Sequence, residues 1–537
     1  MGNISLLDCT LRDGGYLNDW EFGKNNIINV YERLVSAGID IIEVGFIDDR
    51  RSYDPDRTIF PDTASMSETF KGVSKGNSLI VGMIDYGTCD ISKVQPASEA
   101  FVDGIRVIFK KQKMEAAIDF CGKIKALGYK VFAQAVSITS YNDEEFQTLI
   151  NLVNDLEPYA FSLVDTYGLL HRKALRHYFD YADKNLKEVI GLGYHAHNNF
   201  QLAYANCIEL LQDPPKGRRV IVDGTLYGMG KSAGNTPIEL LAMYMNDNIE
   251  KKYHNSQLLE AIEVTILDIS KKLSWGYSFK FFLAASHDCH PNYVDFLMDK
   301  RKLSVKSIGE ILDRLEGDKK LLFDKDYIAE LYLEYQKKDC DDSNDRECLK
   351  SMLSGHNILL VGPGNNVYSE KGKVDNYIKE KSPIIIAINF IPDGIGINYI
   401  FMSNAKRYVQ LSTGLLEQRN FCRLISTSNI TGTRGEFDYT LNFGSLTDDD
   451  ALMPDNPMIM LLKLLKEMDV KEIGLAGFDG YREASVPNYI NPNMEYDYSA
   501  DLANKINEDV VTGINKLNIR EKLAFVTSSL YEVSENR

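Results

Sequence analysis

Short apolar segments recur along the first half of the chain, and polar, helix-like intervals separate them. The segments begin at Ile4, Asp40, Ser78, Gly104, Lys130, Ala160, Val189 and Arg219. The intervals carry apolar residues at helical spacing, as in 25–38 and 114–128, and each of these two ends in glycine. Eight alternating strand–helix units predict an α/β fold with a closed parallel (β/α)8 TIM barrel; an open doubly wound sheet is the alternative.

The pattern changes after residue 290. Helical stretches follow, and then the acidic, polar segment "KDCDDSNDREC" at 338–348, which we interpret as a linker. A second series of strands and helices begins near Ser354. The prediction is therefore a barrel domain over 1–290, a helical extension with an acidic linker over 291–353, and a second, Rossmann-like α/β domain over 354–537.

Composition narrows the class of protein. The 537 residues carry 60 Lys+Arg against 77 Asp+Glu, a net charge of -17, which disfavours nucleic acid as a partner. We find no leader peptide and no apolar run long enough to span a membrane, so the expected location is the cytoplasm. The eight cysteines include no CxxC pair, which argues against a disulfide framework or a thiolate zinc site.

Polar residues at three predicted strand ends are candidates for chemistry. Asp8 and Arg12 lie at the first, Glu43 lies in the second, and His195 and His197 lie in "YHAHNN". Side chains two apart on a strand point to the same side, so both imidazoles would face the barrel axis and could bind one ion.

One carboxylate and two imidazoles suit a divalent ion that acts as a Lewis acid. Manganese is our first choice, and magnesium, zinc or cobalt also fit this ligand set. Arg12 would place fixed donors beside the metal, with Glu43 holding the guanidinium. The alternative is an Arg–Glu pair that only ties two strands together.

Four blocks, "LLDCTLRDGG", "IIEVGF", "GYHAHNN" and "DGTLYGMGKSAGNTPIELL", resemble the signature segments of the DRE-TIM metallolyase (HMGL-like) superfamily, and most closely its 4-hydroxy-2-oxovalerate aldolases. The resemblance covers roughly residues 1 to 300. It implies that Asp8, His195 and His197 are metal ligands, that Arg12 stabilises an enolate and that Glu43 supports Arg12. It also places Asn235 at or near the metal, although capping of the next helix explains Asn235 equally well.

One departure from that family concerns proton transfer. The related aldolases carry a histidine just after the RDG turn, whereas this chain reads "GGYLNDWEF". Tyr16 in this loop, and His287, His290 or Tyr293 after the barrel, are the candidates, with a helix-entry turn in "CHPNY" as the alternative for His290 and Tyr293. Asp165 and Thr166 are candidate substrate contacts, or simply part of a capped turn.

The second domain offers a weaker signal. "LLVGPGNNV" is a strand that runs into a glycine-bearing turn able to present backbone N–H groups to phosphate, but Val367 stands where a third glycine would fall. The domain faintly resembles nucleotide-sugar domains of the sialyltransferase type. A nucleotide or nucleotide sugar is therefore a candidate ligand, and a module for assembly or partner binding is the alternative.

Together these features predict a metal-dependent carbon–carbon lyase, a class II aldolase whose partners are a 2-oxo acid and an aldehyde. The alternatives are a Claisen-type synthase or lyase acting on an acyl-CoA, and an inactive barrel that serves as a scaffold. A homo-oligomer or a pathway-enzyme partner is also expected.

Overall fold

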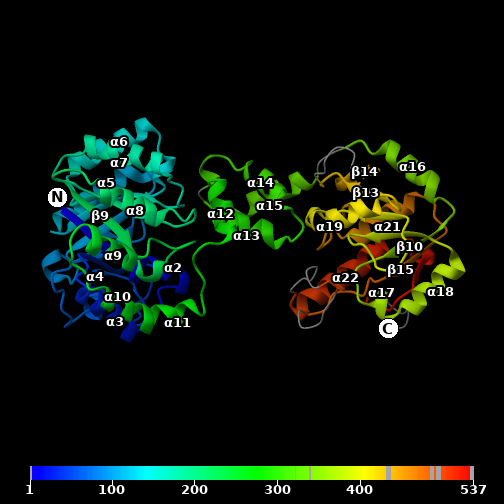
Figure 1. Ribbon diagram of the computed structural model, residues 1–537, viewed down its shortest axis with the longest axis horizontal. Helices are drawn as coiled ribbons and strands as arrows, with labels where there is room; N and C mark the ends of the chain where they lie inside the picture. The colour runs from blue at the N-terminus through cyan, green and yellow to red at the C-terminus, as the bar shows by residue number, and fades with distance from the viewer. Residues whose placement is uncertain are drawn as a thin grey trace. The chain divides into compact units, whose positions relative to one another are not determined.

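The computed structural model describes residues 3–320, 322–337, 340–430, 437–483, 489–491 and 498–532. The chain divides into two compact units, Met1–Pro291 and Asn292–Arg537, and each is described by itself. Figure 1 labels their helices and strands. Within the described ranges, no helix is both long enough and apolar enough to cross a membrane.

The first unit is a closed barrel of eight parallel strands. These are β1 (Asn3–Asp8), β2 (Ile41–Ile47), β4 (Leu79–Asp85), β5 (Gly104–Phe109), β6 (Lys130–Ala135), β7 (Ala160–Asp165), β8 (Gly191–Ala196) and β9 (Arg219–Gly224). β1 pairs with both β9 and β2, which closes the sheet, and a short β3 (Ile59–Phe60) adds to β2. The predicted TIM barrel is confirmed, and the open sheet is excluded for this unit.

Helices follow the strands around the barrel. The main ones are α3 (Lys24–Ser36), α4 (Thr63–Thr69), α5 (Met114–Ala126), α6 (Asp143–Leu156), α7 (Arg172–Asn185), α8 (Ala203–Gln212), α9 (Ile238–Asn248) and α10 (Asn255–Ala261). Local sequence fixes their ends. At the start of α6, for example, Asn142 and Glu145 form a reciprocal capping box. Short helices also occur in loops and after α10: α1 (Thr10–Asp13), α2 (Gly15–Asn18), α11 (Leu267–Ser270) and α12 (Phe279–Ser286).

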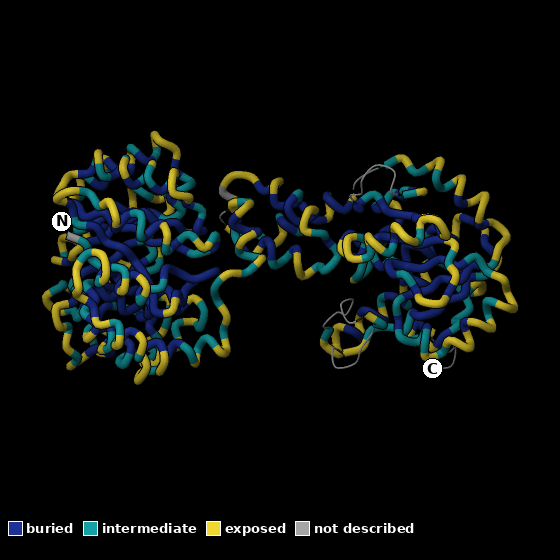
Figure 2. Tube along the Cα trace, viewed as in Figure 1, coloured by how far each residue is buried: buried dark blue, intermediate teal, exposed yellow. Residues whose placement is uncertain are grey.

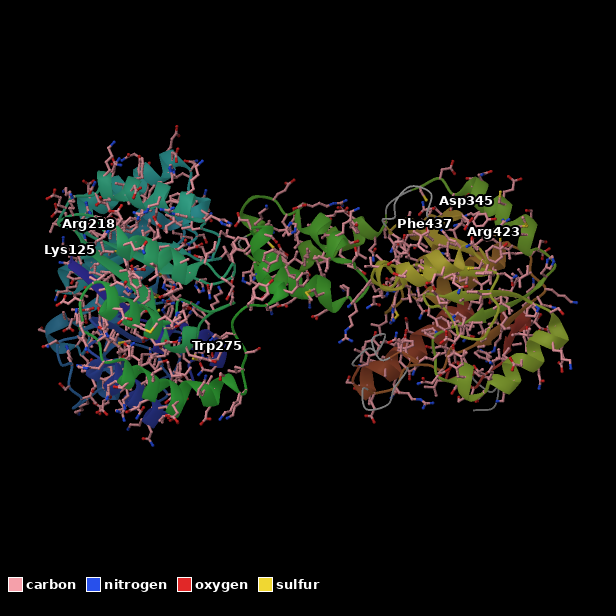
Figure 3. The ribbon with its side chains drawn as sticks, viewed as in Figure 1. Lys125, Arg218, Trp275, Asp345, Arg423 and Phe437 are labelled. Atoms are coloured by element: carbon pink, nitrogen blue, oxygen red, sulfur yellow. The ribbon has the colours of Figure 1, made fainter. Side chains whose placement is uncertain are left out.

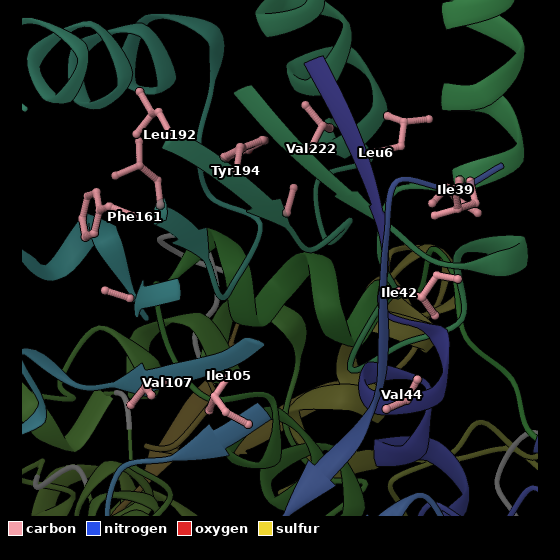
Figure 4. Packing of buried hydrophobic residues seen from close by; sticks show 14 of the residues in the cluster. Leu6, Ile39, Ile42, Val44, Ile105, Val107, Phe161, Leu192, Tyr194 and Val222 are labelled. Atoms are coloured by element: carbon pink, nitrogen blue, oxygen red, sulfur yellow. The ribbon is translucent and has the colours of Figure 1, made fainter. Parts of the chain in front are cut away.

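Alternation along the strands separates two layers of side chains. One set packs outward in the core that the strands share with the helices, and Figure 4 labels Leu6, Ile42, Val44, Ile105, Val107, Phe161, Leu192, Tyr194 and Val222. The residues between them face the barrel axis. Apolar side chains, including Leu7, Ile41, Val81, Phe132 and Ile221, form a separate inner cluster. Farther along the strands, the inward positions become polar.

The second unit begins with helices α13 (Pro291–Asp299), α14 (Val305–Leu312), α15 (Lys325–Gln336) and α16 (Ser343–Leu353). Its sheet is parallel throughout, in the order β14-β13-β12-β11-β10-β15-β16. The strands are β10 (Asn357–Val361), β11 (Ile384–Ile388), β12 (Tyr399–Met402), β13 (Arg423–Thr427), β14 (Tyr439–Leu441), β15 (Glu472–Ala476) and β16 (Leu523–Phe525).

Helices cover both faces of this sheet. Buried side chains of α18 (Lys371–Lys381) and α19 (Ala405–Gln418) join one core cluster, while α16, α21 (Pro457–Glu467) and α22 (Ala500–Lys516) contribute to the other. Two short helices, α17 (Asn366–Ser369) and α20 (Phe443–Leu446), lie in the connections. The strands are largely buried in the tube of Figure 2. The second α/β domain is therefore doubly wound and Rossmann-like, as predicted.

The acidic segment 338–348 differs from the predicted linker. Its second half opens α16, whose Leu349 and Leu353 are buried in the core of the second unit. Asp345, labelled in Figure 3, accepts a hydrogen bond from the Thr440 N–H, and Asp342 accepts one from the Asn442 N–H, both at 2.8 Å. The acidic side chains satisfy backbone donors near the sheet edge, so this part of the segment belongs to the folded unit.

Candidate metal centre

His195 and His197 lie side by side at the end of β8. Their ring centroids are 5.3 Å apart. Nδ1 of His195 lies 2.9 Å from Oδ2 of Asp223, and Nδ1 of His197 lies 3.2 Å from the carbonyl oxygen of Lys231. These acceptors favour a proton on each Nδ1, which leaves both Nε2 atoms available as ligands; carboxylates and carbonyls orient metal-binding histidines in this way.

The carboxylate that faces the two imidazoles belongs to Asp13. Its Oδ2 lies 3.4 Å from Nε2 of His195 and 3.9 Å from Nε2 of His197. Asp13 ends α1, the single helical turn that follows β1. Our sequence reading missed this residue as a ligand, although it directly follows Arg12 in "LRDGG".

The predicted ligand Asp8 is not part of this centre, and that prediction is wrong. Asp8 lies two residues after Leu6 on β1, on the side of the strand that faces the helices. Its carboxylate accepts hydrogen bonds from the N–H and the hydroxyl of Thr10, at 2.9 and 2.8 Å. Burial raises the pKa of Asp8 to about 7. Asp8 therefore closes the turn that leads into α1.

A buried chain of charges supports the centre from the barrel axis. Arg12 bonds to Glu43 through Nε at 2.7 Å, and its Nη1 lies 3.0 Å from Oδ1 of Asp13. Arg106 reaches the same Glu43 oxygen at 3.1 Å, and its Nη2 bonds to Asp223. Glu43 therefore links the two guanidinium groups. The last member of this series of charges is Asp223, the carboxylate that orients His195.

Sequence reasoning singled out Arg12 and Glu43 but missed Arg106, Asp223 and Gln134, whose amide oxygen lies 3.0 Å from Nη2 of Arg106. The sequence contains a signal that could have identified these three residues. Arg106, Gln134 and Asp223 are charged or amide residues inside strands that otherwise read as apolar, and such residues are rarely buried without partners.

The charges of the centre favour a cation. Three carboxylates (Asp13, Glu43 and Asp223) face two guanidinium groups (Arg12 and Arg106). Burial alone would lower the pKa of His195, but Asp13 and Asp223 raise it, so a proton on His195 or a bound cation would balance the third carboxylate. Burial alone would raise the pKa of Asp13, but Arg12 and the two imidazoles hold it well below its usual value. Burial lowers the pKa of His197 to about 4, so this ring is neutral and able to act as a ligand near neutral pH.

Asn235 completes the surroundings of the centre, as the resemblance implied. Its Nδ2 lies 2.6 Å from Oδ2 of Asp13 and 3.2 Å from Nε2 of His195. Its buried Oδ1 has no hydrogen-bond partner among the described residues. A Cβ atom on Gly230 would lie 1.8 Å from that oxygen, so only glycine fits beside it. An orphaned amide oxygen next to three ligand atoms fits a metal site.

Cys9 also lies at this end of the barrel. Among the described residues, Cys9, Asp13 and His195 offer ligand atoms within 4.8 Å of one another. The thiol donates to the carbonyl oxygen of Gly224 at 3.4 Å, and burial raises its pKa well above the usual value. Because a thiol binds metals as the thiolate, His197 is the better third ligand.

Tyr16 lies in the loop after Asp13 and is 40% exposed. Its ring contacts Trp20 edge-on, with centroids 5.0 Å apart, and the Lys231 ammonium lies 5.6 Å from its centre. Tyr16 is therefore at the solvent side of the centre. Lys231, which the sequence reading did not single out, shares this position.

Asp165 and Thr166 serve the turn after β7. Asp165 accepts hydrogen bonds from the N–H groups of Leu169 and Leu170, at 2.8 and 3.1 Å, and Thr166 accepts one from Ser137 N–H at 2.7 Å. Like Asp8, Asp165 occupies an outward position of its strand. The capped-turn alternative accounts for both residues, and the structure does not place the Asp165 carboxylate with the metal-centre residues.

His290 lies at the end of the first unit and Tyr293 at the start of the second. His287 lies just before them, after α12. The hydroxyl of Tyr293 contacts the carbonyl oxygens of Lys319 and Leu322, both at 2.7 Å, and accepts from Asp324 N–H at 3.0 Å. These contacts tie Tyr293 to the helical part of the second unit, and the catalytic role predicted for it stays a prediction. The role of His290 stays a prediction.

Comparison with known proteins identifies the first unit. Residues 3–265 match the family model described as HMGL-like. A 4-hydroxy-2-oxovalerate aldolase of Geobacillus genomosp. 3 is 24% identical over 270 residues, which are 49% of this chain and 77% of the relative. An oxaloacetate decarboxylase of Mycobacterium tuberculosis is 25% identical over 242 residues, 44% of this chain and 68% of the relative.

A third relative, a 2-isopropylmalate synthase of Halalkalibacterium halodurans, is 26% identical over 292 residues, which are 50% of this chain and 53% of the relative. The matches to these three relatives cover about half of the chain at most, in keeping with a family model that ends at residue 265. The barrel, over residues 3–265, is an HMGL-like domain of the DRE-TIM superfamily.

Proposed function

We propose that the barrel is a divalent-metal-dependent carbon–carbon lyase, a class II aldolase that cleaves or forms 4-hydroxy-2-oxo acids. The observation that carries the proposal is the convergence of Asp13, His195 and His197 on one point, with Arg12 fixed beside it by Glu43. A 4-hydroxy-2-oxovalerate aldolase among the relatives supports the reaction class.

Asp13, His195 and His197 would hold the ion, with Asn235 beside them. A bound divalent ion would supply Lewis acidity toward the carboxylate and carbonyl oxygens of a 2-oxo acid. Manganese is our first choice, and magnesium, zinc or cobalt remain alternatives. Their oxygen and nitrogen ligand preferences suit one carboxylate and two imidazoles.

Arg12 is positioned to stabilise negative charge on the substrate. Its contacts to Glu43 and Asp13 use Nε and Nη1, so Nη2 is the nitrogen that remains for a substrate oxygen. In cleavage, a base removes the proton of the C4 hydroxyl, the C3–C4 bond breaks, and its electron pair moves into the enolate of a pyruvate-type product. The fixed guanidinium would stabilise the reacting substrate most at this stage, because negative charge develops on the enolate oxygen.

Tyr16 is the residue that we assign to proton transfer. It lies in the loop that follows Asp13, and the Lys231 ammonium lies 5.6 Å from the centre of its ring. Burial raises the pKa of the Tyr16 phenol above its usual value, although Arg12 acts in the opposite direction, so the neutral phenol is the form that would donate a proton to the enolate. Its partial exposure leaves a route to solvent for the proton. An aldehyde and a pyruvate-type product leave after the enolate is protonated.

The test is to supply 4-hydroxy-2-oxopentanoate and Mn²⁺ and to follow pyruvate by coupled lactate dehydrogenase. Pyruvate release should stop after chelation and dialysis, and return when Mn²⁺ is added. A buffer-matched sample that is dialysed without chelator controls for loss of protein. Activity that survives complete metal removal would contradict the mechanism.

A Claisen-type reaction is the second candidate, because a 2-isopropylmalate synthase is also among the relatives. Free thiol release from acetyl-CoA in the presence of a 2-oxo acid would identify it. A barrel without activity, acting as a scaffold, would give neither product. We further propose a cytoplasmic protein that forms a homo-oligomer or binds a pathway enzyme.

A further inference from the structure

The second unit has a topological switch point between β10 and β15. From β10 the chain builds the sheet in one direction through β11 to β14, and it then returns to the other side of β10 with β15 and β16. The connections on the two sides of β10 therefore diverge at the carboxyl ends of the strands. In open α/β sheets, ligands bind in the crevice at this place.

A cavity lies there. Its walls come from the turn after β10, the ends of β11 and β12, and the segment after β15, including Gly364, Asn389, Asn404, Arg407 and Asp479. The inner space is about 90 Å³. A larger cavity of about 510 Å³ shares Lys302, Met453 and Asp455 with it. The two spaces together suit an elongated ligand.

The glycine-bearing turn after β10 does not act as the phosphate cradle that its sequence suggested. Its N–H groups are already bonded: Gly362 to the carbonyl of Ala476 at 2.8 Å and Gly364 to the carbonyl of Gly477 at 2.9 Å. The N–H of Asn366 donates to Oδ2 of Asp479 at 2.9 Å. A carboxylate thus occupies the place where phosphate would bind.

Asp479 instead suits a hydroxyl donor. Its Oδ1 lies against Gly364, where a Cβ atom would be 2.5 Å away, and it has no hydrogen-bond partner among the described residues. A buried carboxylate oxygen without a donor carries a desolvation cost that a ligand hydroxyl would offset. The diol of a ribose offers two such hydroxyls.

A cation lies on another wall of the cavity. Arg407, in the first turn of α19, is 7% exposed, and its guanidinium lies 5.8 Å from the centre of the Tyr489 ring. Oδ1 of Asn404 accepts the Arg407 N–H at 3.0 Å, and Oδ1 of Asn389 accepts the N–H of Ser403 at 2.9 Å. The local backbone is thus fixed. A planar guanidinium is well suited to phosphate oxygens.

We propose that this cavity binds a nucleoside diphosphate, alone or as the activating group of a sugar. The ribose hydroxyls would bond to Asp479, the diphosphate would lie toward Arg407, and an attached group would extend into the larger cavity. Lys302, which lines both spaces, pairs with Asp455, and the larger cavity is lined by Lys300 and Arg301 together with Asp299 and Asp449. Aromatic rings in the inner wall (Phe478, Tyr481, Tyr489 and Tyr531) can pack on the base. All residues that line this cavity belong to the second unit.

Calorimetric titration of the intact protein with ADP, GDP, CDP and UDP tests the proposal, with inorganic pyrophosphate as the comparison. At least one nucleoside diphosphate should bind with a submillimolar Kd, about tenfold or more tighter than pyrophosphate, because a single good polar contact is worth about a factor of ten. Absence of heat from all four nucleotides at millimolar concentration would overturn the proposal. Equal binding of pyrophosphate and nucleotides would overturn the nucleoside part of it.

Two substitutions distinguish binding of the nucleoside from binding of the diphosphate. Asp479→Asn should weaken nucleotide binding by about tenfold and leave pyrophosphate unchanged, whereas Arg407→Gln should weaken both by about tenfold or more. Arg419→Gln, at the far end of α19, is the matched control and should bind like the parent. If Arg407→Gln does not fold, the affinities of Asp479→Asn and of the milder Arg407→Lys are compared with those of the parent. Unchanged nucleotide affinity in Asp479→Asn and in either Arg407 variant would contradict the assignment.

Discussion

The barrel and the second sheet place their polar groups in different ways. In the barrel, Glu43, Arg106, His195 and Asp223 stand on the strands themselves, because every second strand residue faces the closed axis. In the open sheet both faces are covered by helices, and most of the buried strand residues are apolar. Its polar groups (Asn389, Ser403 and Asp479) come just after strand ends.

The difference determines how each site is supported. A barrel site is held by side chains that bond across the axis, so removal of one charge leaves others buried and unbalanced. The crevice of the open sheet is built by turns whose backbone groups bond to each other. We therefore expect substitutions in the barrel interior to have larger effects than substitutions at the edge of the second sheet.

The largest effect should come from a buried carboxyl that lies outside the metal centre. Asp8 has a folded-state pKa of about 7 because it is buried, whereas its usual value is 3.8. A raised pKa means that the folded state holds the proton more tightly. The stabilisation is therefore present at low pH and is lost as the pH rises from about 4 to 7, by about 4 kcal/mol.

Urea unfolding of the parent and of Asp8→Asn across this pH range measures the effect. The parent should lose stability relative to the variant as the pH rises, and the difference should stop changing above pH 7. A pH-independent difference would show that the Asp8 carboxyl is already ionised in the folded protein.

Arg12→Lys should reduce turnover by about 10²–10³, because lysine keeps the charge but loses the planar fork that contacts Glu43 and Asp13. Steady-state pyruvate release measures it. Arg51→Lys is a matched control, since Arg51 pairs with Asp19 at the surface. If Arg12→Lys turned over like the parent, Arg12 would only tie two strands together.

Tyr16→Phe removes the proposed proton-transfer group and should lower kcat by about 10²-fold, the lower end of general acid–base contributions. The same variant should keep its metal and its melting temperature, because Tyr16 is partly exposed. Tyr53→Phe, at another exposed position, serves as the control. Unchanged kcat would transfer the role to His290, His287 or Lys231.

The smallest effect belongs to the second unit. Asp345→Asn replaces the carboxylate that accepts from the Thr440 N–H with a neutral acceptor, and it should cost about 1 kcal/mol, as for a weakened hydrogen bond to a charged group. Chemical unfolding measures it. Asp341→Asn, four residues earlier and exposed, is the control. If the parent and Asp345→Asn had equal free energies of unfolding, this hydrogen bond would not stabilise the second unit, and the segment would be interpreted as a linker.

The sequence predicted the repeat, the barrel and the paired histidines, because each follows from a period along the chain. The two-residue spacing of His195 and His197 places both on the axis. The same rule, applied from Leu6, puts Asp8 on the outer side, and our reading did not apply it there. Asp13 could not be reached by strand parity, because it lies beyond β1 in a helical turn.

The charge network was harder to foresee. Arg106 and Asp223 are far apart in sequence and meet only because the barrel closes. In the second unit, the glycine turn looked like a phosphate site, and only the bonds of its N–H groups showed that it is closed. Sequence gives the types of residue at strand ends, whereas the partners of each group depend on the fold.

Metal analysis of the purified protein tests the central claim most directly, namely that Asp13, His195 and His197 form one divalent-metal site. After incubation with Mn²⁺ and gel filtration, the parent and Asp8→Asn should each retain about one ion per chain, and Asp13→Ala should retain little, because loss of a carboxylate ligand removes both charge and a coordinating oxygen. Retention by Asp13→Ala together with loss from Asp8→Asn would contradict the account.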